Sequence, residues 1–299
     1  MTTMVVTLDD PTLAELRRRV LHPERAYPFP TRPRAATADL APRLLARDAA
    51  RHGVAAVRLD APLDAAGFLA VGGALGRLVA ETAPAVQSRV TAGHILNLVT
   101  DVAPTPDVDL QPFAAGVLLL HTESSARPPR SRPRYVLLQC RQAASRPVDG
   151  QTVVISYDEV AARLGPAVLG LLSKVRYRGA RHPLLRRARG RAVFSFRDPG
   201  EQPLELDVDR SVPADRVAPA LTELCAAMYR PEATYAIPWE PGLLALVDNR
   251  RVFHGRTRSG TVDTGRHLQR LRIAPPDRPV VACHEDGQAT REVETRSVP

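Results

Sequence analysis

The residue types best suited to metal chemistry lie in two short segments that are far apart in the sequence. His121-Thr122-Glu123 ends an apolar run that begins at Leu118, and His254 lies shortly after a second apolar run over residues 243–247. If residues 118–123 form a strand, His121 and Glu123 point to the same face, because strand side chains alternate. Two histidines and one carboxylate make the facial triad that binds non-haem Fe(II) and leaves coordination positions open. The sequence therefore predicts an iron site at His121, Glu123 and His254.

The chain has the composition of a globular protein of the cytoplasm. Its 299 residues are enough to bury a sizeable core, and no apolar stretch approaches the ~18 residues that a membrane-spanning helix needs. The N-terminus shows no charged-then-apolar secretory pattern. Cys140, Cys225 and Cys283 are widely spaced and form no CxxC pair, which disfavours a disulfide framework or a structural zinc site. We therefore expect a soluble protein in a reducing compartment, with no membrane partner.

A strong positive charge is the second feature that bears on function. The formal net charge is +9, and Lys174 is the only lysine among the 41 basic residues. Such a balance suits a nucleic-acid surface or an anionic substrate. The arginines are spread along the chain, however, and are not interleaved with aromatic residues as a single-strand platform would require. We attribute most of the charge to a compositional bias, and we expect a small-molecule partner and no nucleic acid. The sequence leaves a homodimer open as one oligomeric state.

Hydrophobic periodicity divides the chain into a helical N-terminal part and a strand-rich remainder. Up to residue 110 we expect helices at 10–20, 38–52 and 64–79, a strand at 54–59, an irregular arm at 22–42 and a long loop at 87–106. Beyond it, short apolar runs separated by turn residues predict strands at 117–121, 135–140, 152–156, 192–196, 204–208, 243–247 and 268–273. Helices are expected at 157–173 and 213–229, and a polar tail at 275–299.

Many short strands at intervals are typical of a sandwich or jelly roll. We therefore predict a mainly β protein with flanking helices, built on a double-stranded β-helix (jelly roll, cupin-like) core. No linker divides the chain, so residues 1–299 are expected to form one domain. Within it, 1–110 supply N-terminal helices and arm or lid segments, 111–274 the jelly-roll core with an insertion, and 275–299 the tail.

An ordered set of motifs resembles the clavaminate synthase-like branch of the Fe(II)/2-oxoglutarate oxygenases, a group related to taurine dioxygenase. The motifs cover roughly residues 117–273, and only their combination is specific. In order they are the HxE at 121–123, the RPRYVLL at 132–138, the Gly-x-Thr at 150–152, the DN followed by HGR at 248–256, and the Arg-x-x-x-Arg at 266–270.

The resemblance implies a role for each matching residue. His121, Glu123 and His254 would ligate Fe(II), and 2-oxoglutarate and O2 would take the remaining positions. Arg266 would pair with the distal carboxylate of 2-oxoglutarate, because its planar fork binds carboxylates bidentately and stays charged. Thr152 would give the same carboxylate a hydroxyl hydrogen bond. Arg270 occupies the position that tends to bind an acidic group of the substrate, and its i+4 spacing places it on the same strand face as Arg266.

The sequence indicates the substrate less clearly than it indicates the iron and the cosubstrate. Arginine-hydroxylating relatives carry acidic residues in a loop before the second histidine, whereas the nearest segment here has Ser195 and Arg197 with the single acid Asp198. This departure disfavours a cationic side chain and favours a neutral or acidic one, so Arg197 is a candidate substrate contact. Asn97, Thr100 and Gln111 precede the HxE where relatives place polar substrate contacts, and each is equally open to a purely structural role.

The preferred hypothesis is an Fe(II)/2-oxoglutarate-dependent dioxygenase that hydroxylates an amino acid or a metabolite derived from one, with release of succinate and CO2. An intact Glu123 favours hydroxylation over halogenation, since halogenating relatives lack that carboxylate. Desaturation or cyclisation would use the same triad. The alternatives are the same chemistry on another anionic molecule, such as a sulfonate, a phosphonate or a nucleotide-like metabolite, and a basic nucleic-acid-binding protein without catalysis.

Overall fold

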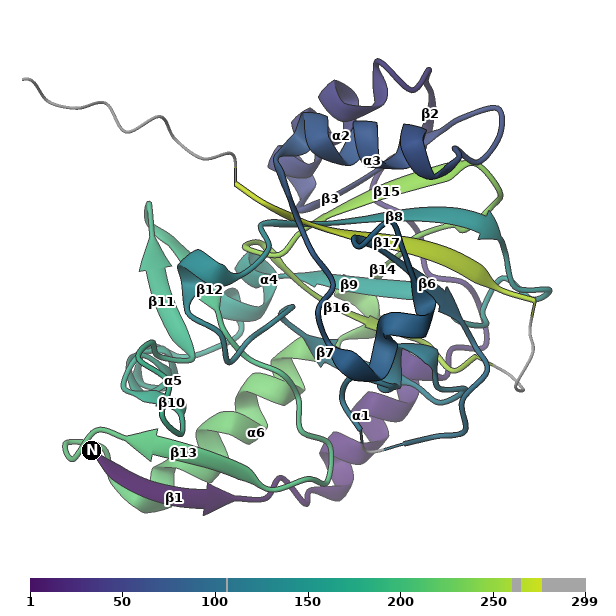
Figure 1. The fold of residues 1–299 in the computed structure, drawn as a ribbon. Coiled ribbons are helices and arrows are strands. Elements are labelled where there is room, and N and C mark those ends of the chain that lie inside the picture. The colour runs from purple at the N-terminus through teal and green to yellow at the C-terminus, as the bar shows by residue number, and fades with distance from the viewer. Residues whose placement is uncertain (106, 260–264, 276–299) are drawn as a thin grey trace, which may run out of the picture.

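The computed structural model describes residues 1–105, 107–259 and 265–275, and the expected tail at 275–299 lies almost wholly outside these residues. Two sheets, one large and one small, dominate the fold (Figure 1), and their strands pair antiparallel except β2 with β3. The large sheet has the strand order β2-β3-β15-β8-β17-β6-β5, with β4 paired to β17. Its strands are β2 (Arg34–Ala35), β3 (Val54–Arg58), β4 (Arg77–Val79), β5 (Val90–Thr91), β6 (Ile95–Val99), β8 (Tyr135–Gln142), β15 (Leu243–Asp248) and β17 (His267–Ala274).

The small sheet carries two of the predicted metal ligands. Its order is β14-β9-β16-β7, and its strands are β7 (Leu118–His121), β9 (Thr152–Ser156), β14 (Tyr235–Ala236) and β16 (Val252–Arg256). One face packs against the large sheet, where Val154 and Val252 share a buried apolar cluster with Val136, Leu138 and Val247. The alternation of side chains in each strand makes this possible, since every second residue faces the opposing sheet.

Helices cover the outer faces of the two sheets (Figure 1). On the large sheet, α2 (Ala41–His52) and α3 (Ala65–Leu75) bury Leu45 and Phe68 against strand residues such as Leu246. On the far side of the small sheet, a second cluster joins its strands to α1 (Pro11–Leu21), α4 (Tyr157–Ala162), α5 (Pro166–Leu172) and α6 (Val217–Met228). Here a three-stranded sheet of β1 (Thr2–Val6), β13 (Leu204–Val208) and β10 (Val175–Tyr177) and the hairpin β11 (Leu185–Ala188)–β12 (Arg191–Phe194) complete the structure.

Most predicted elements are found, but three N-terminal and central predictions were wrong in part. The helix expected over 64–79 ends at Leu75, and residues 77–79 add the short strand β4 to the edge of β17. The loop expected at 87–106 contains β5 and β6, because Leu96 and Leu98 are buried through pairing with β17. The helix expected over 157–173 is two helices, since Gly165-Pro166 interrupts it and Pro166 begins α5.

A buried ion pair ties α1 to the segment that follows β12. Arg17 donates from Nε to Asp198 Oδ2 at 2.8 Å and from its Nη2 to Oδ1 at 2.6 Å, with both side chains buried. Replacing Arg17 by alanine leaves the Asp198 carboxylate buried without its cation. We expect Arg17→Ala to lower the free energy of unfolding by about 3 kcal/mol, as measured by urea denaturation. Arg18→Ala is the matched control, because it removes an exposed pair with Glu15 from the same helix and should leave stability nearly unchanged.

Candidate active site

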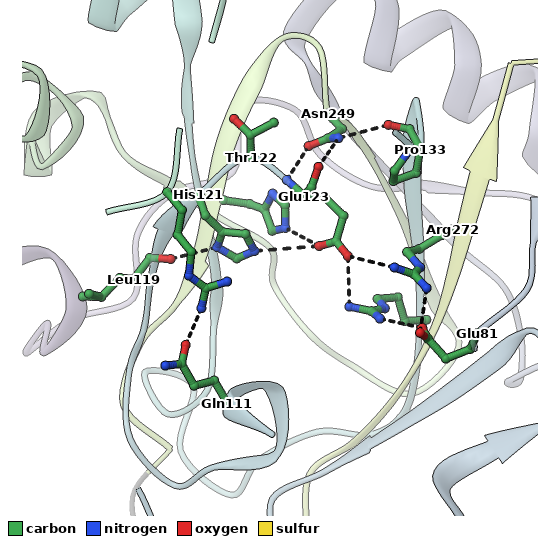
Figure 2. A network of polar contacts seen from close by, with 12 residues as sticks. Glu81, Gln111, Leu119, His121, Thr122, Glu123, Pro133, Asn249 and Arg272 are labelled. Carbon is green, nitrogen blue, oxygen red and sulfur yellow. Dashed lines mark hydrogen bonds and ion pairs between the residues drawn. The ribbon is translucent and has the colours of Figure 1, made fainter. Parts of the chain in front are cut away.

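His121, Glu123 and His254 come together between the two sheets. His121 ends β7 and is the register partner of His254 in β16, so the two imidazoles lie with their centroids 4.3 Å apart. Glu123 Oε2 lies 3.8 Å from His121 Nε2 and 3.6 Å from His254 Nε2. One ligand atom from each side chain falls within 4.8 Å of the others, an arrangement that can hold a metal ion (Figure 2). Two imidazole nitrogens and one carboxylate oxygen suit a divalent first-row transition metal.

The backbone around Glu123 differs from the sequence expectation. The strand stops at His121 and the chain turns at residues 123–124, so strand alternation does not orient Glu123. Asn249 orients it instead. Its side-chain Oδ1 accepts from the Glu123 amide at 2.8 Å, while its Nδ2 donates to the carbonyls of Glu123 at 3.1 Å and Pro133 at 3.0 Å. Glu123 is therefore oriented by hydrogen bonds from the Asn249 side chain and not by a regular strand.

The same neighbourhood sets the protonation of His121 and Glu123. His121 Nδ1 contacts the Leu119 carbonyl at 2.8 Å, which leaves Nε2 directed at Glu123. Burial, together with the charge that His254 can carry, lowers the pKa of His121 to about 4, so its imidazole is neutral at physiological pH. Burial opposes ionisation of Glu123, but Arg270 and the two imidazoles outweigh it and hold the Glu123 pKa well below its usual value. Neutral imidazoles and an ionised carboxylate are the forms that bind metals.

We expect Asn249→Ala to weaken metal binding about 10- to 100-fold, the usual effect of losing a residue that orients a ligand. The physical reason is that Glu123 loses the two hydrogen bonds that fix its backbone. Titration of the metal-free protein with Fe(II) or Co(II) under anaerobic conditions measures the change. Asn97→Ala is the matched control for metal affinity, because the Asn97 amide bonds to Thr91 and Gln269 of the large sheet and not to the metal-site residues. Equal metal affinities in the two variants would contradict this role for Asn249.

A cavity of ≈ 720 Å³ opens beside the three side chains. Apolar residues of β6, β8 and β17 form one wall, including Leu96, Leu138 and Leu268. Its charged lining is mostly basic: three acids, Glu81, Asp109 and Glu123, face six arginines, which are Arg127, Arg197, Arg256, Arg266, Arg270 and Arg272. Arginines therefore outnumber acids two to one among the charged lining residues, and an anionic ligand is the natural counterpart.

Arg266 and Thr152 both line the cavity, and their shared carboxylate site stays a prediction. Arg266 is only 3% exposed, and burial, with a contribution from the nearby charge of Arg256, lowers its pKa to about 9. Gly150 makes room for it: a Cβ at this residue, whose φ is +62°, would lie 2.8 Å from Arg266 Cδ. The Gly-x-Thr motif thus has a steric role that spacing alone did not explain. A buried guanidinium of this kind gains stability from a bound carboxylate.

Gly255 and Arg256, which follow His254, have structural roles at the site. A Cβ on Gly255 would lie 2.6 Å from the Leu118 carbonyl, so glycine allows β16 to approach β7. The Arg256 guanidinium donates to the carbonyls of Pro112, Ala114 and Gly116, the last at 3.0 Å. Arg256 therefore holds the segment before β7 against the cavity. The His-Gly-Arg motif combines one metal-binding side chain with two residues that build its surroundings.

The candidate substrate residues are placed unevenly. Arg270 and Arg197 line the cavity. Gln111 does not line it, but its side-chain oxygen accepts a hydrogen bond from Arg197. Asn97 and Thr100 also lie outside the lining: Asn97 Oδ1 contacts His267 and Gln269, and the Thr100 side chain is buried. Two residues that sequence reasoning missed, Glu81 and Arg272, do line the cavity.

The segment after β12 bears on the expected side-chain preference. Ser195 accepts a hydrogen bond from Arg132 at 2.6 Å, and Asp198 is bound to Arg17, so neither faces the cavity. Arg197 lines it, and its backbone forms a β-bridge with that of His121. This segment therefore contributes the Arg197 guanidinium to the cavity lining. It offers no free carboxylate that could bind a guanidinium or ammonium group of a substrate.

Comparison with known proteins identifies the class. The family model described as taurine catabolism dioxygenase TauD, TfdA family matches residues 27–272, and the chain belongs to this family. The resemblance seen in the sequence motifs and the expectation of an oxygenase are thereby confirmed. A search of curated proteins finds no significant sequence match. Within the described residues, no helix is long and apolar enough to cross a membrane.

Several solved structures share the fold at low identity. PvcB of Pseudomonas aeruginosa, described as an Fe, alpha-ketoglutarate dependent oxygenase from an isonitrile synthetic pathway, is 21% identical with a TM-score of 0.61 over 91% of both chains. An asparagine oxygenase solved with Fe(II), hydroxyasparagine and succinate is 21% identical, with a TM-score of 0.60 over 89% of this chain and 92% of that one. The non-haem iron oxygenase OrfP, solved with Fe and alpha-ketoglutaric acid, is 19% identical, with a TM-score of 0.56 over 90% and 86%.

Proposed function

We propose that this protein is an Fe(II)/2-oxoglutarate-dependent dioxygenase that hydroxylates an amino acid or a metabolite derived from one. The observation that carries the proposal is the His121, Glu123 and His254 cluster in the wall of a cavity that also contains a buried arginine, Arg266. The donor set fits ferrous iron, and a buried guanidinium beside it fits a dicarboxylic cosubstrate. The membership of a dioxygenase family and the iron oxygenases among the structural neighbours support the same assignment.

In this proposal each residue has one task. His121, Glu123 and His254 hold the iron, and Arg266 with Thr152 holds the distal carboxylate of 2-oxoglutarate. Bound iron and 2-oxoglutarate would supply the oxygen activation that couples release of succinate and CO2 to hydroxylation of a C–H bond. Asn249 keeps Glu123 in place, and the apolar wall keeps water from the reacting carbon. Arg270 binds an acidic group of the substrate, and Arg197 favours a neutral or acidic substrate side chain.

We further propose that residues 1–299 form one domain whose 111–274 core is a double-stranded β-helix. Support comes from the two mainly antiparallel sheets that face each other and together build the cavity. An asparagine oxygenase and an iron oxygenase solved with (3S)-hydroxy-L-Arg, both structural neighbours, support an amino-acid substrate. The excess of arginines in the lining favours, as the second candidate, the same chemistry on another anionic molecule such as a sulfonate or a phosphonate.

The test is the anaerobic visible spectrum of the protein with Fe(II) and 2-oxoglutarate. A weak metal-to-ligand charge-transfer band is expected, because an iron held by His121, Glu123 and His254 would bind the 2-oxo acid directly. Screening amino acids and their derivatives for stimulated succinate release then identifies the substrate class. Folded protein that gives no band in the presence of both components would overturn the proposal, whatever the outcome of the screen.

A further inference from the structure

Two arginines and a glutamate form an ion-pair cluster in the cavity wall beside Glu123 (Figure 2). Glu81 Oε2 lies 2.9 Å from the Nη2 of Arg270, and its Oε1 lies 2.6 Å from the Nη2 of Arg272. On their other side the two guanidinium groups approach Glu123 Oε1, at 3.4 Å from Arg270 and 3.8 Å from Arg272. All four side chains are at most 14% exposed. We call Glu81, Arg270 and Arg272 the paired-arginine cluster.

The strand geometry places both arginines at the cavity. Leu268, Arg270 and Arg272 are alternate residues of β17, and all three line it. Glu81 comes from the segment after β4, which pairs with β17 so that Val79 stands opposite Arg272. Glu81 therefore reaches across a strand edge and holds the two guanidinium groups side by side. Of these three residues, only Arg270 was predicted from the sequence. In the structure, Arg272 lies beside it and Glu81 forms an ion pair with both arginines.

The cluster has more donors and more positive charge than its own residues satisfy. Two guanidinium groups carry five N–H donors each, whereas Glu81 offers one carboxylate. The Nε atoms of Arg270 and Arg272 are buried and, among the described residues, have no hydrogen-bond acceptor. Glu123 is the second carboxylate near the two arginines, but it would also be a ligand of the metal, so its charge would be shared between the metal and the arginines. An oxyanion in the adjacent cavity space would supply both the missing charge and the missing acceptors.

The same geometry disfavours an ammonium group at this place. Glu123 Oε2 faces the two imidazoles, Glu123 Oε1 faces the arginines, and both oxygens of Glu81 are bound to them. All four carboxylate oxygens of Glu81 and Glu123 are therefore already engaged. The third acid of the lining, Asp109, is exposed. A free ammonium would have to displace a guanidinium and would lie beside two like charges in a partly buried site.

We propose that the paired-arginine cluster binds the carboxylate of an amino-acid derivative whose nitrogen carries no positive charge, for example an N-acylated amino acid. This inference rests on the proposed function and narrows its substrate class. Arg270 and Arg272 bind the carboxylate oxygens, and Glu81 is a positioning residue that fixes the two guanidinium groups. Thr82, Ala83, Pro84 and Val86, which follow Glu81 and line the cavity, give the uncharged nitrogen substituent a mainly apolar surface.

The experiment compares matched sets of compounds that share one side chain. Each set contains a free L-amino acid, its N-acetyl derivative and the N-acetyl amide, for asparagine, aspartate, glutamate, leucine and tyrosine. Binding to the anaerobic protein loaded with Fe(II) and 2-oxoglutarate is followed by calorimetry and by the perturbation of the charge-transfer band. We expect at least one N-acetyl acid to bind about tenfold or more tightly than both its free acid and its amide.

Variants then test the named residues. Arg272→Gln should weaken binding of the N-acetyl acid roughly tenfold and reduce its advantage over the free amino acid, while the 2-oxoglutarate affinity stays unchanged. Glu81→Gln should also weaken it, because the arginines lose the carboxylate that aligns them. The matched control is Arg141→Gln, which changes an exposed arginine of β8 that bonds to the Leu63 carbonyl outside the cavity.

The outcomes separate this inference from the function on which it rests. If the charge-transfer band forms but no N-acetyl acid binds more tightly than its free counterpart, the substrate class proposed here is wrong and the oxygenase assignment stands. Wild-type affinity of the preferred N-acetyl acid for folded Arg272→Gln overturns the role of the pair. Absence of the band with Fe(II) and 2-oxoglutarate is instead a failure of the proposed function itself.

Discussion

Replacing His254 by alanine is expected to abolish succinate formation and the charge-transfer band with Fe(II) and 2-oxoglutarate. His254 provides one of the three atoms that lie within 4.8 Å of one another in the cluster, and two remaining ligands do not hold the ion in a fixed open geometry. The loss should be complete within detection in both measurements. Anaerobic Fe(II) titration should show that the defect is in metal binding and not in a later step.

The fold should survive this change, which makes the result interpretable. His254 packs on one side against His121, and its Nδ1 is buried without a hydrogen-bond partner among the described residues, so its removal breaks no internal hydrogen bond there. Thermal unfolding and far-UV circular dichroism should confirm a native-like protein, and His254→Gln offers a second variant with a polar side chain. His94→Ala, which alters a histidine outside the cavity, is the control. Full iron binding by folded His254→Ala would refute the metal site.

Arg266→Ala should raise the 2-oxoglutarate concentration needed for half-maximal succinate release by roughly 10- to 150-fold. This range corresponds to the ~1.5–3 kcal/mol that a hydrogen bond to a charged group contributes. Burial, with a contribution from the nearby charge of Arg256, lowers the pKa of Arg266 to about 9, so a carboxylate bound beside it stabilises the charged guanidinium. The stabilisation that 2-oxoglutarate gives to thermal unfolding should fall in parallel.

Two further variants show whether the effect belongs to Arg266. Arg266→Lys keeps a cation but loses the planar fork, and it should give an intermediate affinity for 2-oxoglutarate. Arg270→Ala should leave the 2-oxoglutarate affinity within a few-fold of wild type and weaken substrate binding instead. If Arg266→Ala depends on 2-oxoglutarate as the wild type does, the cosubstrate carboxylate is bound elsewhere, and Arg256, which is equally buried, becomes the next residue to test.

The sequence by itself determined the chemical identity of the site. Short motifs made the candidate residues recognisable. These motifs are the HxE at 121–123, the HGR at 254–256 and the Arg-x-x-x-Arg at 266–270. Short apolar runs predicted the strands that carry His121 and Arg270, and the structure places these strands in the small and the large sheet. A run of apolar residues needs only local information, since it records which stretch of the chain is buried.

Only the tertiary structure decided what surrounds those side chains. Asn249 replaces strand alternation in orienting Glu123, from 126 residues away, and Glu81 reaches Arg270 and Arg272 across 189 and 191 residues. Asn97 shows the reverse case, because pairing of β6 with β17 directs its amide to Gln269 and leaves it outside the cavity. Contacts between distant segments depend on sheet order and register, which no single stretch of sequence encodes. The sequence therefore determined which groups could do chemistry, and the packing of two sheets decided which charges they meet.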